Sequence, residues 1–157
     1  MYIKGAIFDL DGTLIDTEPI YYEAANKLIK EHGNGKKMDW DTKIKILGSP
    51  EIVTAKIFVD TYELKLSPEE FIQKRNVITS ELFKNCPFIE GAKEITHKFK
   101  HELNFKTALA TSSTLVNYNY KIFNKQEWIK DDFDAVILGD DKRIKNGGLI
   151  FKKGNIV

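Results

Sequence analysis

Three short apolar runs, each followed at once by polar residues, constrain the fold of this chain more than any other feature of its sequence. The runs cover residues 3–8, 106–110 and 135–138. Their length and polar ends are typical of buried strands, and the stretches between them show the spacing of helices. Strands that alternate with helices predict an α/β fold with a parallel sheet and right-handed crossovers. Ligands bind beyond the carboxyl ends of the strands in such sheets, so the polar residues there are the first candidates for a site.

The long stretch between the first two runs differs, because every pattern in it is helical. Residues 19–32 carry apolar side chains at helical spacing, and residues 67–70 form a capping box with proline at the first helical position. No strand-like run interrupts this stretch. We therefore predict two domains: an α/β core, residues 1–15 and 87–157, and an inserted all-helical domain, residues 16–86.

Composition excludes several classes of function. Lys and Arg number 24 and Asp and Glu number 23, a formal net charge of +1, so no basic excess indicates nucleic acid or an anionic membrane as a partner. No apolar run approaches the roughly 18 residues of a membrane span. The single cysteine, Cys86, can form no internal disulfide, and the first residues lack the apolar segment of a signal peptide. We expect a globular protein of the cytoplasm.

Two acidic residues, Asp9 and Asp11, follow the first predicted strand in the segment FDLDGTLIDTE. Because side chains alternate along a strand, both carboxylates are expected on the same side. Such a pair is most often a solvated turn, but here Gly12 permits a sharp turn close to a ligand and Thr13 adds a hydroxyl, which favours a phosphate site. One carboxylate can attack phosphorus while the other serves as general acid and base. Two carboxylates beside a phosphate dianion require a divalent cation, and Mg²⁺ prefers such oxygen ligands.

The same segment resembles the first motif of the haloacid dehalogenase superfamily, DxDGT followed by [LV]xDTE. The resemblance implies that Asp9 is the nucleophile and Asp11 the general acid/base, with Mg²⁺ held by the Asp9 carboxylate and the Asp11 backbone carbonyl. The segment TALATSS is similar to the second motif, although ATSS alone would be read as a helix N-cap. It implies that Thr111 and the Ser112 amide hold the phosphoryl group. The fold implied is a Rossmann-like core with a small helical cap that carries substrate selectivity.

The resemblance ends near residue 147. The family continues with Gly-Lys-Pro, which supplies a lysine, but here Gly147 is followed by Gly148, and Lys145 is the candidate substitute. The acidic pair of the family's fourth motif and its last strands have no counterpart before Val157. We therefore expect an incomplete core, weak Mg²⁺ binding and low phosphatase activity for the chain as given. The absent strands would lie beside the first one, and we expect the exposed sheet edge to allow self-association.

Several functions stay open at this level. The first hypothesis is Mg²⁺-dependent hydrolysis of a small phosphomonoester, a nucleotide or sugar phosphate, through an aspartyl-phosphate, as in the pseudouridine-5'-phosphatase-like group. The alternatives are the FMN hydrolase half of a riboflavin kinase-type bifunctional protein, an inactive fragment with a binding or regulatory role, and a β-phosphoglucomutase-like phosphotransferase. Such mutases place an arginine shortly after a cap glycine, whereas Gly48 here is followed by Ser49 and Pro50.

The three histidines, His32, His97 and His101, share no metal-ligand spacing with acidic residues along the chain. Each lies in a stretch rich in lysine or glutamate. We therefore predict that they are surface residues rather than metal ligands.

Overall fold

The computed structural model describes residues 5–142 of the chain. The described chain forms two compact units. One unit consists of Glu18–Leu82, and the other consists of the described residues up to Thr17 and from Phe83 onward. Each is described by itself below. Lys145 and the tail that follows it lie outside the described residues. The division into a core and a substrate-selecting cap stays a prediction.

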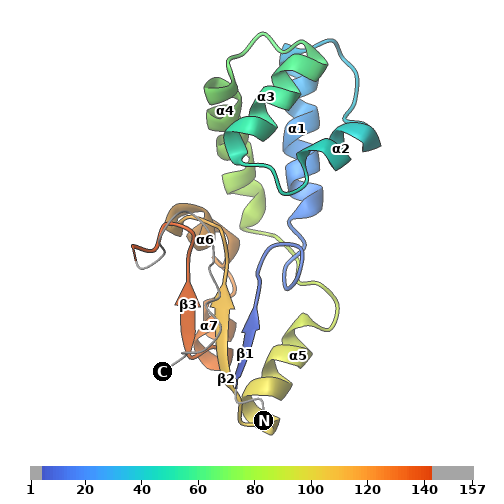
Figure 1. Ribbon diagram of the computed structural model, residues 1–157. Coiled ribbons are helices and arrows are strands. Elements are labelled where there is room, and N and C mark those ends of the chain that lie inside the picture. Colours follow the sequence, from blue (N-terminus) through green and yellow to red (C-terminus); the bar gives the residue numbers. More distant parts are fainter. Residues whose placement is uncertain (1–4, 143–157) are drawn as a thin grey trace. The chain divides into compact units, whose positions relative to one another are not determined.

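The α/β unit is built on a three-stranded parallel sheet, which the sequence predicted (Figure 1). Its strands are β1 (Gly5–Phe8), β2 (Lys106–Ala110) and β3 (Ala135–Ile137). β2 lies in the centre, with Phe8 opposite Leu109 on one side and Val136 opposite Leu109 on the other. Because the strands are parallel, their carboxyl ends lie at one edge of the sheet, and the loops after them can form a common site.

Helices connect these strands. α5 (Ala92–His97) continues directly into a π-helical turn, η1 (Lys98–Glu102), which leads into β2. α6 (Leu115–Lys121) and α7 (Gln126–Asp132) lie between β2 and β3 in the chain. The prediction of an α/β fold is confirmed, because helices lie between β1 and β2 and between β2 and β3.

Aromatic rings fill the interior of this unit. Phe8 packs edge-on against Phe99 and Phe133, with ring centroids 5.7 and 6.0 Å apart. Trp128 packs edge-on against Phe133 and Phe88, at 5.2 and 4.9 Å. Edge-to-face pairs of this kind add roughly 0.5–1.5 kcal/mol each beyond the area that they bury. They hold η1 and α7 against the sheet.

The other unit is entirely helical. It contains α1 (Glu18–His32), α2 (Trp40–Ile46), α3 (Glu51–Tyr62) and α4 (Pro68–Phe83), of which the last residue belongs to the α/β unit. Its core is a cluster of buried side chains from α1, α3, α4 and the connecting loops: Ala25, Leu28, Ile29, Met38, Ala55, Phe58, Tyr62, Leu64 and Phe71. α2 lies in the stretch predicted to be helical, but no apolar pattern marked this helix, because its only buried residue is Thr42.

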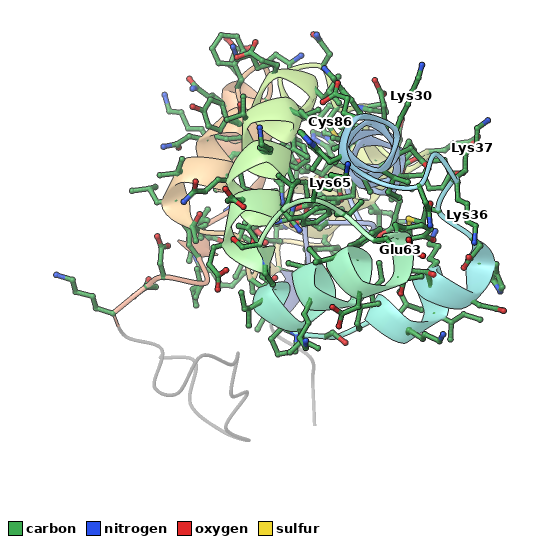
Figure 2. The ribbon with its side chains drawn as sticks, turned by 90° about the horizontal axis from the view of Figure 1, so that it is seen from above. Lys30, Lys36, Lys37, Glu63, Lys65 and Cys86 are labelled. Carbon is green, nitrogen blue, oxygen red and sulfur yellow. The ribbon has the colours of Figure 1, made fainter. Side chains whose placement is uncertain are left out.

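Local signals in this unit behave as predicted. The Ser67 hydroxyl accepts from the Glu70 amide at 3.1 Å, and the Glu70 carboxylate accepts from the Ser67 amide at 2.7 Å, so the capping box is confirmed. Lys36 and Lys37, in the loop after α1, are exposed and project away from the helices (Figure 2). Across residues 5–142, no helix has the length and apolar character needed to cross a membrane.

Candidate active site

The loop after β1 folds into a tight turn that presents the two acidic residues. The Gly12 amide donates to the Ile15 carbonyl at 2.9 Å, and the Leu14 amide donates to the Leu10 carbonyl at 3.0 Å. Gly12 has a φ of 68°, in the left-handed region that glycine adopts without strain. Asp9, Gly12 and Thr13 are exposed. The apolar residues of the turn are buried: Leu10, Leu14 and Ile15.

Asp11 lies at the centre of a hydrogen-bonded group from three segments. The Thr111 hydroxyl donates to Oδ2 at 3.3 Å, and the Ser113 hydroxyl donates to the same oxygen at 3.0 Å. The Lys121 ammonium donates to Oδ1 at 2.6 Å. Both carboxylate oxygens are therefore bonded, which holds the side chain in one orientation.

Lys121, the last residue of α6, was not identified from the sequence. Its side chain is 1% exposed; its Nζ also donates to the Ser113 hydroxyl at 2.7 Å and lies 4.8 Å from the centre of the Phe83 ring. A signal existed: Lys121 lies three residues after Tyr118 and directly before Ile122, on the apolar face of the predicted helix. A lysine on such a face is rare unless its charge is paired, and here Asp11 pairs it.

Asp9 stands exposed beside this group. Loss of solvation raises the pKa of its carboxyl, and the negative charge of Asp11 acts in the same direction. The Leu10 amide, the Lys121 ammonium and the Thr13 hydroxyl lower that pKa but do not cancel the rise. The carboxylate is therefore more basic than an ordinary aspartate while remaining open to a reactant.

The loop after β2 supplies the second side of the site. Thr111 is fully buried and its hydroxyl accepts from the Ser113 amide at 3.1 Å, whereas Ser112 is exposed. Gly139 lies so close that a Cβ there would be 2.1 Å from the Ser112 carbonyl oxygen, so only glycine fits. The Gly139 amide donates to the Ser113 carbonyl at 2.9 Å, which fixes the loop against the segment after β3.

Asp140 caps α6, since its carboxylate accepts from the Leu115 amide at the start of that helix, at 3.0 Å. It thereby positions the helix that carries Lys121. The structure joins Asp11 and Thr111 directly and adds Ser113 and Lys121 to them. Lys145, the candidate substitute for the family's lysine, lies outside the described residues.

Comparison with known proteins places this arrangement in a family. The chain is 34% identical over 145 residues to a probable pseudouridine-5'-phosphatase of Saccharomyces cerevisiae, covering 92% of this chain and 60% of that protein. It is 32% identical over 147 residues to (DL)-glycerol-3-phosphatase 2 of Arabidopsis thaliana, covering 92% of this chain and again 60% of the relative. The chain thus spans less than two thirds of the length of these relatives.

Solved structures agree on the fold. A HAD hydrolase of family IA, variant 3, from Entamoeba histolytica superposes with a TM-score of 0.71 at 18% identity, covering 91% of this chain and 64% of that one. Residues 6–148 match the family described as haloacid dehalogenase-like hydrolases. This range includes the loop after β1, with Asp9 and Asp11, and the loop after β2, with Thr111. The chain belongs to the haloacid dehalogenase-like hydrolases.

Proposed function

We propose that this protein hydrolyses small phosphomonoesters, with Asp9 as the nucleophile and Asp11 as the general acid/base. The observation that carries the proposal is the contrast between the two carboxylates. Asp9 is exposed, whereas both oxygens of Asp11 are bonded to Lys121, Ser113 and Thr111. One carboxylate is thus open to a substrate and the other is held beside it, as a division of roles requires.

The reaction follows in two steps. A carboxylate oxygen of Asp9 attacks phosphorus, the bond from phosphorus to the ester oxygen breaks, and the leaving alkoxide takes a proton from Asp11. Asp11 then removes a proton from water, which attacks the same phosphorus and releases inorganic phosphate and free Asp9. The Lys121 ammonium, 2.6 Å from Asp11 Oδ1, holds this side chain in place for both proton transfers.

Hydroxyl and amide groups around the acids suit a phosphoryl group. Gly12 and Thr13 on one loop, and Thr111 and the Ser112 amide on the other, are the proposed phosphate-binding residues. Gly12 and Ser112 are exposed, so their backbone lies within reach of a ligand. Backbone amides at a turn beside a strand end form an anion site in many proteins.

The oxygen donors also fit Mg²⁺ in kind. Among residues 5–142, neither Asp9 nor Asp11 belongs to a close group of three or more His, Cys, Asp and Glu side chains. Mg²⁺ is commonly bound by one or two carboxylates together with substrate phosphate and water, and Asp9 with the Asp11 carbonyl would supply the protein's share. When bound, the cation would offset the negative charge of the phosphoryl group.

The substrate class follows from the relatives and stays a proposal. Two of them are named for pseudouridine-5'-phosphate and glycerol-3-phosphate, which share a phosphate on a small polar alcohol. We propose this class for the present chain. The substrate panel also tests the two alternative enzymes. FMN tests the alternative hydrolase. A sugar phosphate that is converted without net release of phosphate would indicate a mutase.

The proposal is tested by phosphate release from this panel and from p-nitrophenyl phosphate, with Mg²⁺ present. Asp9→Asn is expected to abolish release, and Asp11→Asn to reduce it by about 10²–10⁴-fold, the usual contribution of general acid/base catalysis. Asp60→Asn is the matched control, because Asp60 is exposed and pairs only at the surface with Lys56. Because we expect low activity for the chain as given, release is followed over long incubations at high protein concentration. A rate for Asp9→Asn near that of the wild type, or no release by the wild type from any substrate under these conditions, contradicts the proposal.

A further inference from the structure

A second cluster of metal-ligating side chains lies in the α/β unit, apart from the acidic site. It consists of His97 at the end of α5, His101 in η1, and Asp132 at the end of α7. The ligand atoms of the three residues all lie within 4.8 Å of one another. Within residues 5–142, no other group of three or more His, Cys, Asp and Glu side chains is this close. His97 and His101 are surface residues, as predicted, but they lie close to a carboxylate that the spacing along the chain did not indicate.

The two imidazoles are brought together by the π-helical turn. His97 and His101 are four residues apart, and their ring centroids lie 4.4 Å apart. A π-helical turn is wider than an α-helical one, and such turns often occur at functional sites. Two histidines at i and i+4 on one helix face form a common pair of metal ligands. The sequence spacing alone did not show this, because the third group is 31 residues further along the chain than His101.

The carboxylate is held in place by a buried network. The Asp132 side chain is 6% exposed, and its Oδ2 accepts from the Thr96 hydroxyl at 2.6 Å. Thr96 Oγ1 in turn accepts from the Trp128 indole at 2.9 Å. This leaves Oδ1 turned toward the histidines, at 3.1 Å from His101 Nε2 and 3.8 Å from His97 Nδ1. Outer contacts that fix a carboxylate in this way are typical of metal sites.

The distances between the three side chains are compatible with a shared transition-metal ion. Metal–ligand bonds of about 2.0–2.1 Å at tetrahedral angles put neighbouring ligand atoms about 3.4 Å apart. The distances from Asp132 Oδ1 to the two histidine nitrogens lie on either side of that value. Two imidazole nitrogens and one carboxylate oxygen form a donor set that binds divalent transition metals. Nitrogen donors select Zn²⁺, Co²⁺, Ni²⁺ or Cu²⁺ over Mg²⁺.

We propose that His97, His101 and Asp132 bind a divalent transition-metal ion of the Zn²⁺ class. The site is open on one side, since the two imidazoles are 62% and 41% exposed, and water would complete the coordination. It lies toward the start of β2, where the Thr107 hydroxyl donates to the Asp132 carbonyl at 2.6 Å. The acidic site lies at the other end of that strand, next to Thr111. A bound metal would therefore join η1 to α7 without taking part in phosphate chemistry.

The test is a Co²⁺ titration of the whole chain without a polyhistidine tag, in excess Mg²⁺ so that the oxygen-rich site is not counted. Co²⁺ with nitrogen ligands at low coordination absorbs visible light, and Zn²⁺ should displace it. We expect uptake of one equivalent by the wild type. The variants His97→Gln and His101→Gln should bind more than about 10-fold more weakly, since even outer-shell changes cost about 10–100-fold.

The matched control is His32→Gln, which removes the remaining histidine, on α1, outside the cluster. Because His97 and His101 are exposed, their replacement should leave the circular dichroism spectrum unchanged, which separates lost ligands from lost folding. Binding that persists in the His97→Gln, His101→Gln double variant overturns the proposal. So does an absence of uptake by the wild type at millimolar Co²⁺. Neither result bears on phosphate release, so this inference and the proposed function fail separately.

Discussion

At the scale of single residues, the pairing of Lys121 with Asp11 is the most informative contact in the protein. A buried ammonium requires a partner, because removing an unpaired charge from water costs several kcal/mol. Asp11 and Ser113 supply that partner at 2.6 and 2.7 Å. The same contact positions the group that we propose as the general acid/base. Lys121 is thus a positioning residue whose charge also acts on Asp9.

Replacing Lys121 tests this role through the pH profile. Lys121 lowers the pKa of Asp9, so Lys121→Met should raise that pKa further and move the acid limb of the activity profile to higher pH. Asp9 must be ionised to attack, so activity at low pH should fall more than activity at high pH. The profile of phosphate release against pH measures the shift.

Lys125→Met is the matched control, because Lys125 is also buried but does not contribute to the pKa of Asp9. Its acid limb should stay at the wild-type position. An unshifted limb in Lys121→Met would show that Lys121 has only a structural role.

At the scale of elements, Asp134 joins the start of β2 to the segment before β3. Its Oδ2 accepts from the Thr107 amide at 2.9 Å, and its Oδ1 pairs with Lys100 at 2.7 Å and Lys106 at 3.3 Å. The bond to Lys100, with that to Thr107, holds the pKa of Asp134 well below its usual range. The ionised carboxylate therefore stabilises the register of β2 and β3.

The pH dependence of this contribution has a definite sign. The folded-state pKa is depressed, so the stabilisation is present above the unfolded value, about 3.9, and is lost as pH falls toward the folded value. Asp134→Asn should lower the free energy of unfolding by about 0.5–1 kcal/mol at pH 7, because Asp134 is exposed and solvent screens its ion pairs. At pH 3 the difference from wild type should be smaller. Urea unfolding at the two pH values measures both; an equal difference at both would contradict the assignment.

At the scale of the whole molecule, the described sheet leaves β1 with a single strand neighbour, β2. An edge strand presents unpaired amide and carbonyl groups, which can pair with a second chain. Self-association through this edge stays a prediction. Ile7, on β1, is 40% exposed and offers an apolar contact for such pairing.

Ile7→Lys tests that prediction, since a lysine on an edge strand opposes pairing between chains. We expect the wild type to show a larger mass at high concentration in light scattering, and Ile7→Lys to remain monomeric. Ile95→Lys is the control, because Ile95 is also 40% exposed but lies on α5. Equal masses for the two variants would show that β1 is not the contact.

The sequence by itself determined what is local. Strand and helix periodicity depend on neighbouring residues, so the parallel α/β core and the capping box at Ser67 were predicted correctly, and the two motifs identified the loops that carry Asp11 and Thr111. The tertiary structure alone decided which distant groups meet. Lys121 contacts Asp11 across 110 positions, and Asp132 reaches His101 across 31. No periodicity records such separations, because they are set by how helices pack on the sheet.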